Sequence, residues 1–290
     1  MSLIDLRGKT ALITGVSDDV GFAWHIAKAL QNQGAEIILC CHPRVMSIVE
    51  RFLTKDKYAP GRKLKNGGEL KPKYLIPCDV ALDTHADLSA EQKSQKGYEG
   101  EDASIEGLKS TLEKKGEHID IVIHSVAFSP EIDRLHLDVS RQGYLTSMSI
   151  SAYSLVALCR ALLPFMAGRQ ASVIALSYLA SERAVPFYGG GMASAKAALE
   201  CDARMLSWQL GALGHRINII SAGPYASRAA RSIGDIEAMV EKTKEKSPLR
   251  RAITPEDVAD AALFFASDLS TAITGETLHV DAGFHAMALV

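Results

Sequence analysis

The sequence predicts an α/β fold: a single Rossmann-like, doubly wound domain with a seven-stranded, mainly parallel sheet and helices on both faces. Short apolar runs of strand length alternate with helix-length segments, an order typical of a parallel sheet covered on both sides. The 290 residues are 47% hydrophobic, which is enough to bury a large core. Because α/β folds of this size are routinely one domain, we expect residues 1–290 to fold together.

Seven apolar runs account for the expected strands. In chain order they cover residues 10–14, 35–40, 74–77, 119–124, 172–176, 216–220 and 276–280. Parallel α/β sheets bind their ligands beyond the carboxyl ends of the strands. The chemistry should therefore collect in the turns that follow these runs.

The turn after the first strand is a candidate dinucleotide site. The strand ends at Gly15 and leads through Val20 and Gly21 into a helix. Glycine lets the turn bend tightly and lets backbone N–H groups approach a pyrophosphate at the helix N-terminus. The spacing is not Gly-x-Gly-x-x-Gly, so an ordinary turn is the alternative, and the order strand, turn, helix favours the dinucleotide. Asp18 and Asp19 are unusual beside a phosphate unless their side chains turn away or cap the helix.

The region about twenty residues after Gly21 usually places a carboxylate on the adenosine ribose. This chain has His42 and Arg44 there and no acid, so the choice between NADH and NADPH stays open, and Arg44 is compatible with a 2′-phosphate. Asp79, after the third strand, is a candidate acceptor for the adenine amino group. Small residues at 125–127, after the fourth strand, let the backbone approach a cofactor.

The stretch 177–196 sets two tyrosines and a lysine beside an apolar strand and a glycine-rich turn. Tyr188 lies just before an expected helix over 192–210, and Lys196 lies in the first turns of that helix. A nearby ammonium favours the charged form of a phenol, so we expect it to lower the pKa of Tyr188 from about 10. A phenol so placed can donate a proton to a developing oxyanion. Taken alone, the pair would be chance more often than chemistry.

Several motifs together resemble the short-chain dehydrogenase/reductases along the whole chain. They are Thr-Gly at the first turn, Asp79-Val80, Ser125-Val126-Ala127, the tyrosine and lysine pair, and Ile220-Ser221-Ala222-Gly223-Pro224. Ordinary members place tyrosine four residues before lysine, whereas Tyr188 precedes Lys196 by eight. They also have a serine thirteen residues before the tyrosine, where this chain has Ala175. Both departures are typical of the enoyl-acyl-carrier-protein reductases, whose second tyrosine lies ten residues before the first, as Tyr178 does here.

The finer similarity is to the plastid, apicomplexan and chlamydial enoyl reductases. Its motifs are Tyr-Gly-Gly-Gly-Met-x-Ser-Ala-Lys-Ala-Ala-Leu-Glu, Ile-Ser-Ala-Gly-Pro-x-Ala-Ser-Arg-Ala and Ala-Ile-Thr-Gly-Glu-Thr-Leu-x-Val-Asp. Two positions depart from that subgroup. This chain has Phe22-Ala23 where the subgroup has Tyr-Gly, and His42 where it has a tryptophan beside the adenine.

The resemblance implies NADH-dependent reduction of the trans-2 double bond of enoyl thioesters, within type II fatty acid synthesis. Tyr188 would stabilise the enolate, Lys196 would bind the nicotinamide ribose, and Tyr178 would shape the acyl site or assist proton delivery, with a packing aromatic as the alternative. The implied cofactor-binding residues are Gly15, Val20, Gly21, His42, Asp79, Val80, Ser125, Val126, Ala127, Lys196, Ile220, Ser221, Ala222, Gly223 and Pro224. The candidate substrate-lining residues are Phe187, Met192 and Tyr225, for which core packing is an equal explanation. The cofactor would be NAD (NADH), with NADPH not excluded.

Partners follow from the same resemblance: acyl carrier protein carrying the enoyl substrate, and a homotetramer. The segment 225–247 is the natural lid, with helical pieces over 226–233 and 235–246. Arg204, Arg228 and Arg231 are candidates for docking the acidic carrier protein, with a solvated face as the alternative. The insert-like stretches 54–73 and 83–102 have the composition of surface excursions.

Composition and charge exclude other classes. The net charge of −2 points to no nucleic-acid partner, and no apolar run reaches the roughly 18 to 20 residues of a membrane span. The first residues show no basic and apolar leader, which favours a cytoplasmic location. The five cysteines lack metal-ligand spacing, so we expect no metal site.

Two rival functions stay open at this point. One is a 3-oxoacyl or other carbonyl reductase of the same superfamily, which the eight-residue spacing and Ala175 disfavour. The other is a non-catalytic nucleotide-binding scaffold, which the intact tyrosine and lysine disfavour.

Overall fold

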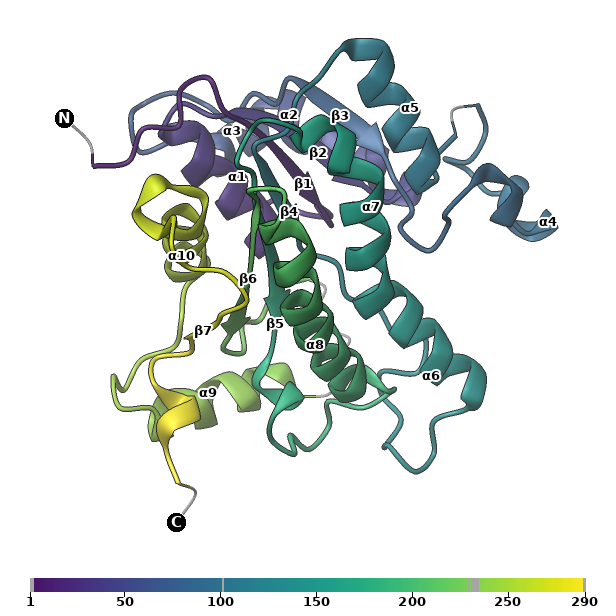
Figure 1. Ribbon diagram of the computed structural model, residues 1–290. Helices are drawn as coiled ribbons and strands as arrows, with labels where there is room; N and C mark the ends of the chain where they lie inside the picture. Colours follow the sequence, from purple (N-terminus) through teal and green to yellow (C-terminus); the bar gives the residue numbers. More distant parts are fainter. Residues whose placement is uncertain (1–2, 101, 229, 231–234, 289–290) are drawn as a thin grey trace.

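The computed structural model describes residues 3–100, 102–228, 230 and 235–288. These residues form a seven-stranded sheet in the order β3-β2-β1-β4-β5-β6-β7, with every neighbouring pair parallel (Figure 1). The expected fold class is confirmed, and each strand lies within two residues of its predicted bounds. The strands are β1 (Thr10–Thr14), β2 (Glu36–Cys41), β3 (Tyr74–Pro77), β4 (Ile121–His124), β5 (Ser172–Ser177), β6 (Arg216–Ala222) and β7 (Thr277–Val280).

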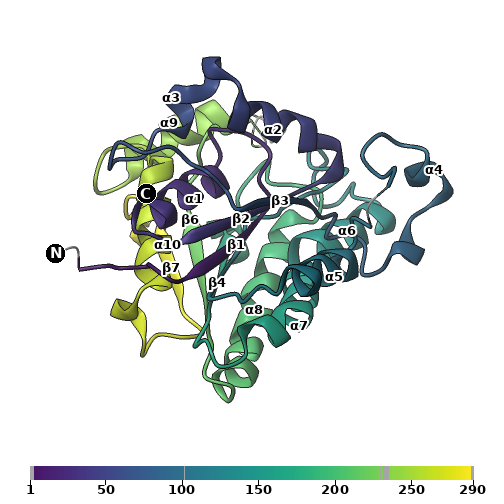
Figure 2. The same cartoon turned by 90° about the horizontal axis from the view of Figure 1, so that it is seen from above.

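Helices cover the sheet in two layers (Figure 2). One layer contains α1 (Phe22–Asn32), α2 (Met46–Thr54) and α10 (Pro255–Ala266), and the other contains α5 (Ile105–Lys115), α7 (Ser154–Met166) and α8 (Met192–Gly211). The remaining α-helices of the described ranges are α3 (Ala59–Arg62), α4 (Ala90–Lys93), α6 (Arg141–Met148) and α9 (Ile236–Lys246).

The alternation of side chains along the strands divides the core between the two layers. On β1, Ala11 and Ile13 pack toward α1 and α10, while Leu12 packs toward α5, α7 and α8. On β2, Leu39 packs in the same layer as Ala11 and Ile13, and Ile38 packs in the same layer as Leu12. Successive residues of a strand point to opposite faces, so continuous apolar strands are needed when both faces are covered.

One helical stretch corrects an expectation from the sequence. Residues Arg141–Met166 run continuously through α6, a π-helical turn at Ser149–Tyr153 and α7. By length and composition this stretch is apolar enough to cross a membrane, and half of its apolar window is buried inside the protein. Serines interrupt its apolar residues, which is why the sequence showed no such run. Core helices of soluble proteins meet the same criterion, so it is weak evidence for a membrane.

Both insert-like stretches are anchored by buried side chains. In the first, Arg62 is buried and donates from Nη1 to the backbone oxygens of Phe52 and Lys55, each at 2.9 Å. In the second, Tyr98 is buried in a small apolar cluster with Leu82, Leu88 and Ala103. The polar composition of these stretches indicated neither anchor.

Candidate active site

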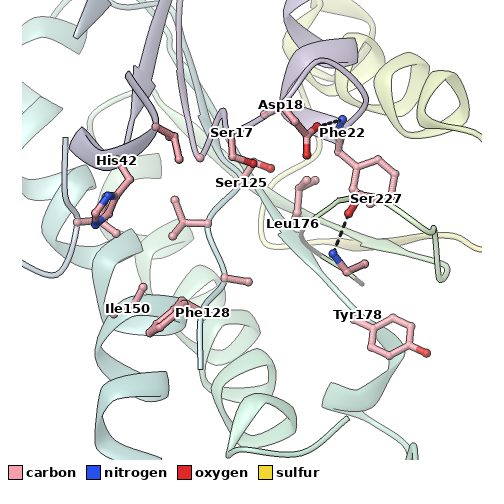
Figure 3. A pocket seen from close by; sticks show the side chains of 18 of the residues that line it. Ser17, Asp18, Phe22, His42, Ser125, Phe128, Ile150, Leu176, Tyr178 and Ser227 are labelled. Atoms are coloured by element: carbon pink, nitrogen blue, oxygen red, sulfur yellow. Dashed lines mark hydrogen bonds between the residues drawn. The ribbon is translucent and has the colours of Figure 1, made fainter. Parts of the chain in front are cut away.

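A cavity of about 710 Å³ opens at the carboxyl ends of the strands, where the sequence predicts the chemistry. It runs from His42, after β2, to Tyr178, after β5, and these two residues lie at opposite ends of the view in Figure 3. Turns from β1 to β6 contribute to its lining, together with α9. The topology therefore gathers one site from segments that are far apart in the sequence.

Most of the predicted site residues line this cavity. They are Gly15, Gly21, His42, Asp79, Val80, Ser125, Val126, Ala127, Tyr178, Tyr188, Lys196, Ala222, Gly223, Pro224 and Tyr225.

Five predicted residues do not line it. Ile220, Ser221 and Met192 are buried in the core, at 0%, 1% and 2% exposure. Phe187 is 63% exposed, and its backbone has a φ of 69°. Val20 is also exposed. The cavity therefore gives no support to substrate contacts from Phe187 and Met192, or to cofactor contacts from the other three.

Gly15 holds the turn after β1 against the turn after β4. Its φ is 78°, in the left-handed region that favours glycine. A Cβ built on Gly15 would lie 2.0 Å from the backbone oxygen of Ser125. Only glycine allows the two turns to approach this closely at the floor of the cavity.

Asp18 caps the turn that enters α1. The sequence analysis gave capping as one of the ways in which an acid could be accommodated beside a phosphate. Asp18 is 3% exposed, and its carboxylate accepts from the backbone N–H groups of Val20 at 3.0 Å and Gly21 at 2.6 Å. Figure 3 draws one of these bonds as a dashed line at Asp18. Those two N–H groups are thus engaged by Asp18. The expectation that they face a pyrophosphate is not met in this structure.

A hydrogen-bonded trio closes the end of the cavity at which adenine is expected. The Tyr98 hydroxyl donates to Asp79 Oδ2 at 2.6 Å and lies 3.1 Å from His42 Nε2. The backbone N–H of Ala81 donates to Asp79 Oδ1 at 3.0 Å. Burial alone would raise the pKa of Asp79, but the hydrogen bonds from His42 and Tyr98 hold that pKa below its ordinary value.

Tyr98 is one of the cavity-lining residues that sequence reasoning missed, and it is the one in contact with two predicted site residues. It belongs to the insert-like stretch 83–102, and the only signal in the sequence was a single aromatic residue in a polar segment. The same insert supplies Gln95, whose side-chain oxygen accepts from the Arg44 guanidinium. Arg44 also lines the cavity, beside His42, at the place expected for the adenosine ribose.

At the other end, Tyr178 and Tyr188 lie in ring contact, and Lys196 lies beneath the end of β5. The Lys196 ammonium donates to the backbone oxygen of Leu176 at 2.8 Å. Burial raises the pKa of Tyr188 above its ordinary value, and burial followed by the charge of Asp281 raises the pKa of Tyr178 to about 12. The expected lowering of the Tyr188 pKa is therefore wrong, because burial, followed by the neighbouring Tyr178, raises that pKa.

Lys196 itself is almost fully buried, at 4% exposure. Burial lowers its pKa to about 8, and the Glu200 carboxylate acts in the opposite direction. His124, at the end of β4, is fully buried and close enough to Lys196 to be affected by its charge. Burial, followed by the charge of Lys196, lowers the His124 pKa to about 3, so this imidazole is neutral.

The expected lid is described in part. Its second helical piece is α9 (Ile236–Lys246), from which Ile236 and Met239 line the cavity. Half of the first piece, 226–233, lies outside the described residues, and so does the docking candidate Arg231. Arg228 and Arg204 are exposed.

Comparisons with known proteins agree with this geometry. A family model described as enoyl-(acyl carrier protein) reductase matches residues 100–285. The chain is 43% identical to the rice chloroplastic enoyl-[acyl-carrier-protein] reductase [NADH] 2, over 99% of this chain and 77% of the relative. It is 39% identical to the enoyl-[acyl-carrier-protein] reductase [NADH] of Aquifex aeolicus, over 98% of this chain and 94% of the relative. The crystal structure of Plasmodium berghei enoyl-acyl-carrier-protein reductase with triclosan superposes with a TM-score of 0.91 and 37% identity, covering 96% of this chain and 98% of that one.

Proposed function

We propose, because this chain belongs to the enoyl-acyl-carrier-protein reductase family, that it reduces the trans-2 double bond of enoyl thioesters held on acyl carrier protein, with NADH as the reductant. The reaction would serve type II fatty acid synthesis. One observation carries the proposal: Tyr178, Tyr188 and Lys196 line the same cavity as Gly15 and Gly21 of the turn between β1 and α1.

The residues present fit a nicotinamide dinucleotide. Gly15 and Gly223 allow close backbone packing in the turns that line the cavity. A Cβ on Gly15 would lie 2.0 Å from the Ser125 oxygen, and a Cβ on Gly223 would lie 3.1 Å from Asp281 Cα. The cavity extends from His42 to Tyr178 past small residues at 125–127, which suits an elongated molecule. Bound there, NADH supplies a hydride to C3 of the enoyl group. Relatives named for NADH support that choice over NADPH.

Tyr188 acts on the thioester oxygen, where negative charge develops as C3 is reduced. Its raised pKa keeps the phenol protonated at neutral pH, so its hydroxyl can donate a hydrogen bond to the enolate oxygen. A proton delivered at C2 then completes the saturated thioester. Tyr178, in ring contact with Tyr188, shapes the same end of the cavity.

Lys196 orients the cofactor rather than the substrate. Its side chain reaches the end of β5 from within α8, which places the ammonium beside the phenols. A charged lysine there would bind the nicotinamide ribose hydroxyls and hold the ring over the double bond. Fixing the two reactants in this way lowers the barrier, because orientation is settled before the reaction.

Apolar side chains line the part of the cavity left for the acyl chain. They are Phe128, Ile150, Tyr225, Ile236 and Met239. Ile236 and Met239 come from α9, the described part of the lid. A chain of methylenes would lie against these side chains, as apolar ligands do in pockets of this kind.

Assembly and location follow as further proposals. A homotetramer is supported by exposed apolar side chains on α8, where Met205 and Trp208 are 62% and 77% exposed. Light scattering of the purified protein tests it. A cytoplasmic location is proposed alongside a plastid one, since the rice relative is named chloroplastic.

Oxidation of NADH and of NADPH, followed in parallel by absorbance with crotonyl thioester, tests the function. We expect consumption of NADH that falls about 100-fold in Tyr188→Phe, because one oxyanion donor is lost. Acetoacetyl thioester, which offers a ketone in place of the double bond, is assayed in parallel as the comparison substrate. Its turnover without crotonyl turnover would identify a 3-oxoacyl reductase, and nucleotide binding without any turnover would identify a scaffold.

A further inference from the structure

Two consecutive residues of β5 are tied to two residues of α8 that lie one helical turn apart. The Lys196 ammonium donates to the backbone oxygen of Leu176, and the hydroxyl of the next residue, Ser177, donates to the Glu200 carboxylate. Glu200 is only 6% exposed, and Ser177 is 5% exposed. The residue that follows Ser177 is Tyr178. A buried acid one helical turn from the lysine is therefore bonded to the strand end that carries a site tyrosine.

We propose that Glu200 is a positioning residue of this site, which keeps the buried Lys196 ammonium charged and, through Ser177, fixes the end of β5 that carries Tyr178. The inference rests on the proposed function for its catalytic meaning. Its geometry rests only on buried side chains of α8 and β5. Glu200 is the last residue of the motif that begins at Tyr188, and the sequence analysis gave it no role.

The surroundings of Lys196 contain little else that would hold its charge. A buried ammonium without a counter-charge gives up its proton. His124 faces Lys196 from β4 but is neutral, and its Nε2 pairs with Ser154 Oγ at 2.7 Å. The phenols of Tyr178 and Tyr188 have raised pKa values and are neutral as well.

Among the described residues that act on Lys196, Glu200 is thus the anion. Ser177 satisfies one lone pair of this carboxylate, as a buried carboxylate requires. The net pKa of Lys196, about 8, reflects burial opposed by Glu200.

The variant Glu200→Gln removes the charge and keeps the shape of the side chain and an acceptor for Ser177. Opposite charges at short range shift a pKa by about one unit or more, so the pKa of Lys196 should fall by at least about one unit. The alkaline limb of the kcat/KM profile for NADH should move to lower pH by the same amount. Asp202→Asn is the matched control, because it removes the same charge from a half-buried position on the same helix.

The deciding measurement is the NMR titration of lysine Cε signals in the wild type and both variants, with the Lys196 signal assigned by its loss in Lys196→Arg. We expect a shift in Glu200→Gln and none in Asp202→Asn. An unchanged Lys196 titration in Glu200→Gln, or equal shifts in both variants, overturns the proposal. Should Glu200→Gln not fold, a wild-type Lys196 that is already neutral at about pH 7 overturns it.

This readout does not depend on turnover. If the wild type shows the expected titration but reduces no enoyl thioester, the proposed function fails while the role of Glu200 in charging Lys196 stands. If turnover is present and the titration is unchanged, only the role of Glu200 fails.

Discussion

The rings of Tyr178 and Tyr188 lie edge to face, with centroids 4.9 Å apart and planes inclined by 62°. The two residues come from opposite sides of the 3-10 turn and loop that join β5 to α8. Both side chains are partly buried at this contact, and burial raises both pKa values. The end of the cavity thus presents neutral hydroxyl donors at neutral pH.

Tyr178→Phe keeps this ring contact and removes one hydroxyl. We expect kcat for crotonyl thioester to fall about tenfold or less, compared with about 100-fold for Tyr188→Phe, because only Tyr188 is assigned to the enolate oxygen. Steady-state kinetics of the two variants side by side give the comparison. Equal losses would mean that the two phenols share the donor role.

Tyr98→Phe tests the adenine end of the cavity. Loss of its hydroxyl removes the donor to Asp79 and the contact with His42, so the dissociation constant for NADH should rise about fivefold. Titration of NADH fluorescence measures it without any thioester. Tyr58→Phe is the control, because its ring packs on Phe52 away from the cavity. Unchanged NADH affinity in Tyr98→Phe would remove Tyr98 from the binding site.

Gly15→Ala should destabilise the protein by about 3 kcal/mol or more, because it adds a steric clash to backbone strain. The new Cβ would lie 2.0 Å from the Ser125 oxygen at a φ of 78°. Gly214→Ala carries a similar φ of 82° with no atom within 4 Å of the Cβ, so it should cost only about 1 kcal/mol. Urea unfolding of both variants isolates the clash. Equal losses in the free energy of unfolding would show that backbone strain alone, without the steric clash, accounts for the destabilisation.

Asp257 at the start of α10 should give the protein a measurable acid sensitivity. Its carboxylate binds the Arg251 guanidinium at 2.6 Å and the backbone N–H of Thr254 at 2.8 Å. The hydrogen bond from Arg251, ahead of the other contacts, lowers the Asp257 pKa from 3.8 to about 2. A lowered folded-state pKa contributes stability above the unfolded value, and this contribution is lost as the pH falls toward 2.

Asp257→Asn should therefore cost about 1 kcal/mol at neutral pH, after allowance for the exposed Arg251. The difference from wild type should shrink toward zero as the pH falls from about 4 to about 2. Urea unfolding across this range provides the measurement, with Asp260→Asn on the same helix as the control. A difference that stays constant with pH would contradict the assignment.

Sequence patterns predicted the fold, and they singled out three residues that line one end of the cavity, because these patterns are local. The apolar runs of β1 and β3 end where the strands end, and the apolar spacing of 192–210 became α8. A strand that is buried on both faces of a parallel sheet needs apolar residues at nearly every position, which produces such runs. The tyrosines at 178 and 188 and the lysine at 196 were identified from one continuous stretch, so no long-range information was needed.

Only the tertiary structure determined which side chains are in contact and how deeply each of them is buried. Tyr98 reaches Asp79 from an insert whose sequence is polar, and Glu200 reaches Ser177 from another element. The pKa of Tyr188 moves up rather than down because of burial, which no spacing along the sequence reveals. Periodicity records the local environment of a residue, whereas pairing and desolvation depend on segments brought together by the fold.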